Sequence, residues 1–174
     1  MIVDILTRHY PQSEWITTGA VSNADEWDMN VNWETIEVKK PTWSEIEPLL
    51  TQYEITSSKE QKLTELNDSC SSAIRAGFVS NALGSDHHYS TSSNEDQINL
   101  TGAVALGADI FYSCTDTATN KKQMRLHTHA QIKKVLSDGA SEKTKLMQRY
   151  YDKVELVNAA TTVEEIEAIV WGDK

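Results

Sequence analysis

FVSNALGSDHHYST, residues 78–91, is the stretch that decides how the chain folds. Residues 78–82 have the composition of a strand, and Gly84 after them can adopt the positive φ of a tight turn. Residues 87–90 have the pattern of a returning strand. The stretch therefore predicts a β-hairpin, and the rest of the chain can be divided around it.

Four regions follow from this division. Residues 1–40 contain short strand-like runs separated by turn residues, beginning with MIVDIL. Residues 41–77 form a helical connector, residues 78–136 a compact α+β module, and residues 137–174 C-terminal helices. We therefore predict an α+β protein with short N-terminal strands, a hairpin–helix–hairpin module on a small antiparallel sheet, and a helical C-terminus.

Capping boxes, in which Thr precedes Glu or Gln by three residues, mark several predicted helix starts. They are Thr42 with Glu45, Thr128 with Gln131, and Thr162 with Glu165. We expect the connector to contain two helices, the second beginning near Ser58. We also expect two helices after Thr128, with the longer one over residues 141–158.

Residues 110–127 predict a second hairpin around the polar turn TDTATNKK. Met124 and Leu126 share one side of its second strand, and Phe111 faces away from its neighbours in the first strand. The helix between the two hairpins contains Gly102, which indicates close packing against a neighbour.

Composition limits the classes of partner. The chain has 174 residues and a formal charge of −10, which repels nucleic acid and anionic lipid, so we expect neither as a partner. It contains no run of 18 apolar residues, and its N-terminus lacks the basic segment of a signal peptide. Cys70 and Cys114 have no C-x-x-C spacing, so they predict neither a disulfide nor a zinc site.

The triplet Asp86-His87-His88 raises the possibility of a metal centre. One hypothesis is a metal-dependent hydrolase that uses His87 and His88 to help hold an ion that activates water. A phosphoesterase centre of this kind needs further carboxylates, usually as Asp-x-Asp, and the chain has none. Adjacent histidines in a strand also point to opposite faces. We therefore favour histidines of a hairpin strand.

A second metal hypothesis joins this pair to His127 and His129, since four imidazoles could hold zinc or iron. The capping box at Thr128 ends the strand and starts a helix, so the two rings of this pair should diverge. The sequence predicts hairpin and cap histidines, with no metal.

Other catalytic motifs are missing from the sequence. It has no G-x-S-x-G, no G-x-G-x-x-G and no phosphate-binding loop. A pair of catalytic carboxylates stays open, because their spacing in space is not visible in sequence. We expect no catalytic residues and no cofactor.

Three tryptophans cluster in the least regular part of the chain: Trp15, Trp27 and Trp33. They can form a small core under the N-terminal strands. They can also form a partner-binding surface, because tryptophan is enriched in interface hot spots. Both interpretations stay open at this point.

The module from Phe78 to Gln131 resembles a small domain of unknown function found on bacteriophage tail-fibre and tail-fibre-assembly proteins. The resemblance rests on FVSNALGSDHHYST, EDQINLTGAVALG, DIFYSCTD and RLHTHAQIKKV. The flanking stretches NWETIEVKKPTWSEIE and AATTVEEIEAIVW are similar to short phage tail proteins. His87, His88 and the His-Thr-His run depart from the pattern, and the family has no established catalytic residues to transfer.

The resemblance implies a non-enzymatic tail or tail-fibre-associated protein that acts through protein–protein contacts. We expect a minor structural component of the virion, with an assembly chaperone that leaves the particle as the alternative. The implied partners are phage tail or tail-fibre proteins, with a homo-oligomer possible. The implied location is the host cytoplasm during assembly and then the virion tail.

Overall fold

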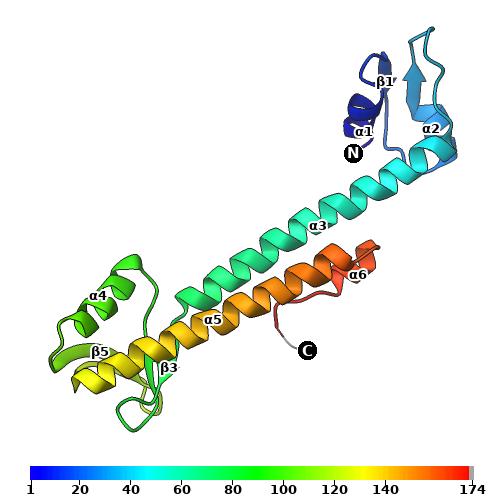
Figure 1. Cartoon of the computed structure of the whole chain (residues 1–174). Helices are drawn as coiled ribbons and strands as arrows, with labels where there is room; N and C mark the ends of the chain where they lie inside the picture. The colour runs from blue at the N-terminus through cyan, green and yellow to red at the C-terminus, as the bar shows by residue number, and fades with distance from the viewer. Residues whose placement is uncertain (173–174) are drawn as a thin grey trace. The chain divides into compact units, whose positions relative to one another are not determined.

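The structure, a computed structural model, describes residues 1–172 (Figure 1). Its helices are α1 (Ile2–His9), α2 (Ala24–Asn30), α3 (Trp43–Arg75), α4 (Asn94–Ala105), α5 (His129–Ala159) and α6 (Val163–Glu167). Its strands are β1 (Trp15–Thr17), β2 (Val31–Trp33), β3 (Phe78–Ser80), β4 (His87–Tyr89), β5 (Ile110–Asp116) and β6 (Lys121–His127). β1 and β2 form one antiparallel sheet, and β3-β4-β5-β6 form a second. The α+β class and the hairpin–helix–hairpin module are confirmed.

The described chain consists of two compact units, each with its own apolar core. Unit 1 comprises Met1–Lys62 and Ala160–Ala168. Unit 2 comprises Leu63–Ala159 and residues 169–172. The four regions predicted from the sequence end where the secondary structure was expected to change. The boundary between the two compact units instead falls inside helix α3, between Lys62 and Leu63.

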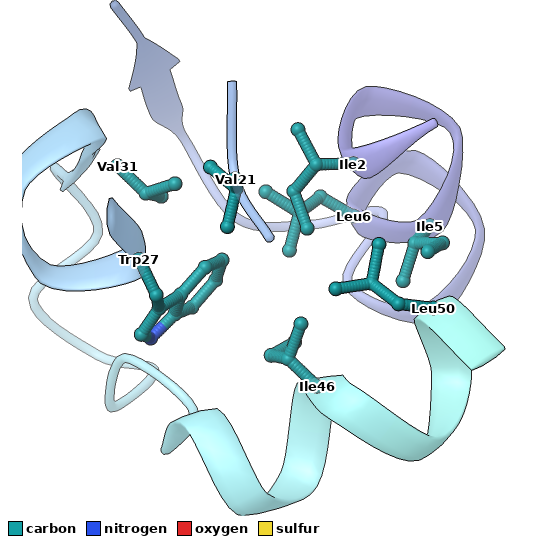
Figure 2. Close-up of a cluster of buried hydrophobic side chains, with 8 residues drawn as sticks. All are labelled: Ile2, Ile5, Leu6, Val21, Trp27, Val31, Ile46 and Leu50. Atoms are coloured by element: carbon teal, nitrogen blue, oxygen red, sulfur yellow. The ribbon is translucent and has the colours of Figure 1, made fainter. Parts of the chain in front are cut away.

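The core of unit 1 gathers side chains from α1, α2 and α3. Figure 2 shows the Trp27 side chain directed toward Ile46 of α3 and Leu6 of α1. We expected a strand at MIVDIL, residues 1–6, but residues 2–9 form helix α1. Ile2, Ile5 and Leu6 recur at the spacing of one helical face, and all three are buried in this core.

The side chain of Lys40 forms hydrogen bonds with the C-terminal end of α2. Its Nζ donates hydrogen bonds to the carbonyl oxygens of Trp27 (3.1 Å) and Val31 (2.8 Å) at the C-terminal end of α2. The ammonium group also lies 5.0 Å from the centroid of the Trp27 ring, a cation–π distance. The Trp27 carbonyl also accepts from the backbone N–H of Val31, so the Lys40 ammonium group adds a second hydrogen bond there and complements the negative end of the helix dipole.

The predicted capping boxes are confirmed as hydrogen bonds. The donor–acceptor pairs are Thr42 N to Glu45 Oε2 (2.7 Å), Gln131 N to Thr128 Oγ1 (3.2 Å) and Glu165 N to Thr162 Oγ1 (3.2 Å). In each case a side chain satisfies an N–H group that the first turn of the helix leaves unpaired. These local signals fix the starts of α3, α5 and α6.

Two predicted helix breaks are absent. α3 continues through Ser58 because no Gly, Pro or Asn lies between Pro48 and Leu66 to interrupt it. α5 likewise continues through Gly139 to Ala159.

The inner face of the second sheet is the side that packs against the unit 2 core. Besides His87, it carries a row of four rings, one from each strand. These are Phe78, Tyr89, Tyr112 and His127. Tyr89 stacks on Phe78 at 5.7 Å between ring centroids and lies 6.4 Å from Tyr112, and Tyr112 lies 6.3 Å from His127. Such separations are favourable for aromatic pairs. We call these rings the aromatic row.

Helix α5 covers the aromatic row, with Ile132 and Val135 buried in the same core. Gly139 on α5 faces the ring of Phe78, and a Cβ added there would lie 2.7 Å from two of its carbons. The missing side chain therefore allows β3 and α5 to pack closely. Gly102 on α4 differs from our expectation, because a Cβ there would meet nothing within 4 Å.

We expect Gly139→Ala to destabilise the protein by about 1–2 kcal/mol, because the overpacking against Phe78 exceeds the gain in helix propensity. Gly102→Ala is the matched control, since it adds the same methyl group to a helix in open space. It should stabilise the protein by about 0.5–1 kcal/mol. Urea unfolding measures the change in the free energy of unfolding for each variant. A Gly139→Ala variant as stable as Gly102→Ala would contradict this packing.

Candidate functional site

The histidines of the first hairpin lie on opposite faces of the sheet. His87 is 2% exposed on the inner face. The ring of His88 is on the outer face, the opposite side of the sheet, and its Nε2 lies 2.7 Å from the carbonyl oxygen of Ala76. The predicted hairpin strand is confirmed. The two rings cannot bind one ion from these positions.

His127 and His129 also diverge, as the capping box predicted. His127 is the last residue of β6, and His129 is the first residue of α5, where its backbone N–H donates to Asp109 Oδ1 at 3.0 Å. Within residues 1–172, no group of three or more His, Cys, Asp and Glu side chains is placed to hold a metal ion.

The two buried histidines share one hydrogen-bonding pattern. His87 Nδ1 lies 2.8 Å from the carbonyl oxygen of Ser85, and His127 Nδ1 lies 2.9 Å from that of Arg125. Because a carbonyl oxygen only accepts, Nδ1 carries the proton in both rings and Nε2 of each neutral ring is an acceptor. The carbonyl two residues earlier in the chain thus fixes both tautomers.

The acceptor atoms of the two rings have different surroundings. The hydroxyl group of Tyr89 donates a hydrogen bond to His127 Nε2 at 2.8 Å, and both side chains are fully buried. His87 Nε2 has no hydrogen-bond partner and lies 3.9 Å from Asp116 Oδ2, too far for a hydrogen bond. Asp116 Oδ2 instead lies 3.4 Å from Arg125 Nη2.

Burial favours the uncharged forms of His127, Tyr89 and Cys114. Burial lowers the pKa of His127 and raises the pKa of the Tyr89 hydroxyl and of the Cys114 thiol. Hydrogen bonds led by the backbone N–H of Thr119 lower the pKa of Asp116. A protonated thiol and a protonated phenol are poor nucleophiles and bases, so this geometry favours a structural network over a catalytic one.

The three tryptophans that the sequence singled out lie in or against the core of unit 1, as does Trp43. Trp27 is 1% exposed and donates its Nε1–H to the carbonyl oxygen of Pro41 at 3.0 Å. Trp15 and Trp33 are partly buried against the core and are register partners in β1 and β2. The small-core interpretation accounts for Trp27, while a partner-binding role for Trp15 and Trp33 stays a prediction.

The outer face of the second sheet carries large apolar side chains in contact with solvent. Phe111 of β5 is 61% exposed and stands opposite the exposed Leu126 of β6. Exposed Met124 is two residues from Leu126 on the same side of β6, and Val79 of β3 is exposed on this face too. We call Phe111, Met124 and Leu126 the outer patch, while Val79 lies apart from them, with His88 and Thr115 between β3 and β6 at its level. The alternation of the sequence predicted that Met124 and Leu126 share a face, but not that this face meets solvent.

Comparisons with known proteins give one match. The sequence model of a family described as a domain of unknown function (DUF4376) matches residues 57–170. No curated protein and no solved structure matches the chain. None of the described helices is long and apolar enough to cross a membrane.

We expect Tyr89→Phe to lower the free energy of unfolding by about 1–3 kcal/mol, because it leaves the buried Nε2 of His127 without a donor. Tyr151→Phe removes the same hydroxyl from an exposed ring on α5 and should change stability by less than about 0.5 kcal/mol. Chemical denaturation of both variants measures the difference. Equal stabilities would show that the buried hydrogen bond contributes little.

We expect His127 to make the folded protein less stable as the pH falls. Its pKa is below the usual 6.5 in the folded state, so the unfolded chain binds more protons once the pH drops through 6.5. The stability is complete above that pH and decreases below it. The measurement is the free energy of unfolding between pH 7.5 and pH 5.5, where His127→Gln should show a shallower slope than the wild type, although it is less stable overall. Parallel slopes would contradict this assignment.

Proposed function

We propose that this chain, which belongs to the DUF4376 family of unknown function, is a non-enzymatic protein of bacteriophage tails or tail fibres. It acts by contacting other tail or tail-fibre proteins. We favour a minor structural component of the virion, present in the host cytoplasm during assembly and in the tail afterwards. The alternative is an assembly chaperone that does not stay in the particle.

The outer patch carries this proposal. Exposed apolar side chains that gather on one surface mark sites of protein–protein contact, whereas scattered ones need no explanation. Phe111 and Leu126 are directly opposed across β5 and β6, so they form a continuous surface with Met124. Burial of such a surface in an assembly removes apolar area from water and stabilises the contact.

The buried cluster supports a non-enzymatic role. His87, His127 and Tyr89 are buried on the inner face, and His88 is on the other side of the sheet. A metal-dependent hydrolase that uses His87 and His88 would need both rings at one open site, so the geometry gives this hypothesis no support. Catalysis elsewhere on the chain has no observation in its favour.

The family match separates two parts of the chain. It begins at residue 57, so that Trp15, Trp27 and Trp33 lie outside it. We propose that the family domain supplies a common scaffold and the preceding residues supply contacts particular to this chain. Trp15 and Trp33, which are partly buried on the two-stranded sheet, are the residues we assign to that contact.

Mass spectrometry of purified particles and of infected-cell lysate tests the proposed function. We expect the protein at a fixed ratio to tail proteins in the particle. An abundant protein in the lysate that is missing from particles would instead identify the chaperone. Absence of any association with tail proteins in both samples would overturn the proposed function.

A variant pair tests the outer patch in the same assay. Phe111→Asp should reduce incorporation into particles by at least about tenfold, equivalent to about 1.4 kcal/mol of binding free energy. Ile98→Asp is the matched control, because Ile98 on α4 is 69% exposed but is not part of the patch. Equal incorporation of the two variants would show that the patch is not the contact.

A further inference from the structure

The segment that follows β2 exposes apolar side chains between acidic ones. Ile36 is 96% exposed, and Val38 in the same segment is also exposed. Glu34 and Glu37 are exposed beside them. The backbone N–H groups of Ile36 and Glu37 bond to no backbone carbonyl of the described chain. The N–H groups of Glu34 and Thr35 already donate to the Glu14 carbonyl, and the Val38 carbonyl accepts from Trp33 Nε1 at 2.7 Å. Residues 36–38 form a bend, so the segment must straighten before it can pair as a strand. Residues 34–38, which we call the acidic segment, therefore offer apolar and negatively charged side chains to a partner.

Strand β6 offers the opposite character. It pairs with β5 on one side only, so its other side is a free strand edge. Lys122, Met124 and Leu126 are all exposed on the outer face of this strand. The side chains of Lys121 and Lys122 form no ion pair with residues 1–172. This positive edge stands out in a chain whose formal net charge is −10.

The two edges match in one register. Parallel pairing with Glu34 opposite Lys122 places Ile36 opposite Met124 and Val38 opposite Leu126. The alternate position brings Glu37 to Arg125. On the outer face, one pair of opposite charges and two apolar pairs therefore coincide, while Thr35 lies opposite Gln123 and Arg125 already contacts Asp116.

Other pairings of these strands fit less well. The antiparallel direction with Ile36 opposite Leu126 and Val38 opposite Met124 places Lys40 opposite Lys122, and like charges in that position are destabilising. Pairing β6 with β6 of another copy gives its lysines no carboxylate, and lysine on an edge strand acts against such pairing.

We propose that the chain associates with further copies of itself, with the acidic segment of one copy added as a parallel strand to the edge of β6 in the next. The contact joins two different surfaces, so an open assembly keeps an unused acidic segment at one end and an unused β6 edge at the other. Such a head-to-tail contact forms a ring if the rotation closes and a filament if it does not. Met124 and Leu126 of the outer patch are covered in this contact, while Phe111 remains for other proteins.

Charge reversal in the full-length chain tests the proposal without any phage protein. Sedimentation velocity over a range of concentrations should show oligomers larger than a dimer for the wild type. Glu34→Lys and Lys122→Glu should each weaken association by at least about fivefold, because each places like charges in contact. The double variant restores opposite charges and should recover most of the wild-type association. Both positions are exposed, so neither change disturbs a core.

A substitution of the apolar residue Ile36 tests the centre of the same register. Ile36→Asp should abolish association, whereas Ile98→Asp should leave it unchanged, although both residues are exposed. A monomer at all concentrations would overturn the proposal, and so would a double charge variant no stronger than its single parents. Because only the purified chain is used, failure here is distinct from failure of the proposed tail function.

Discussion

The aromatic row on the inner face of the β3–β6 sheet is the constraint on which unit 2 depends. It takes one ring from every strand, and the hydrogen bond from Tyr89 to His127 joins β4 to β6, two strands that are not neighbours in the sheet. Helix α5 packs closely on the row, because Gly139 has no side chain and the Phe78 ring can approach the helix backbone there. The donor and acceptor must both be present, since burying either alone would cost the free energy of an unsatisfied polar group.

The surface of unit 2 follows from this inner face. Side chains of a strand alternate between faces, so fixing Tyr112 and His127 inward turns Phe111 and Leu126 outward. No described element of unit 2 buries these outer side chains. A sheet with only one covered face and a free edge at β6 has two places at which it can add a partner, and the proposed tail contacts and self-association use these two places.

Unit 1 is stabilised in another way, because its sheet has only two short strands. A two-stranded sheet is marginal by itself. Trp27 supplies the largest fully buried side chain. The ammonium group of Lys40 contacts the ring of Trp27 and donates hydrogen bonds to the carbonyls at the end of α2. Trp27 is needed inside the core, whereas Trp15 and Trp33 keep partial exposure, which makes them available to a partner.

The sequence by itself determined the features that depend on neighbours along the chain. The capping boxes, the turn at Gly84, both hairpins and the opposed directions of His87 and His88 were predicted, because each depends on a few consecutive residues. The tertiary structure decided the rest. It made a helix of residues 2–9, since Ile2, Ile5 and Leu6 could share a core only on a helical face. It kept helix α5 continuous through Gly139. It also left the outer patch exposed. Alternation along a strand separates its two faces, but which face is buried depends on which other element packs against the sheet.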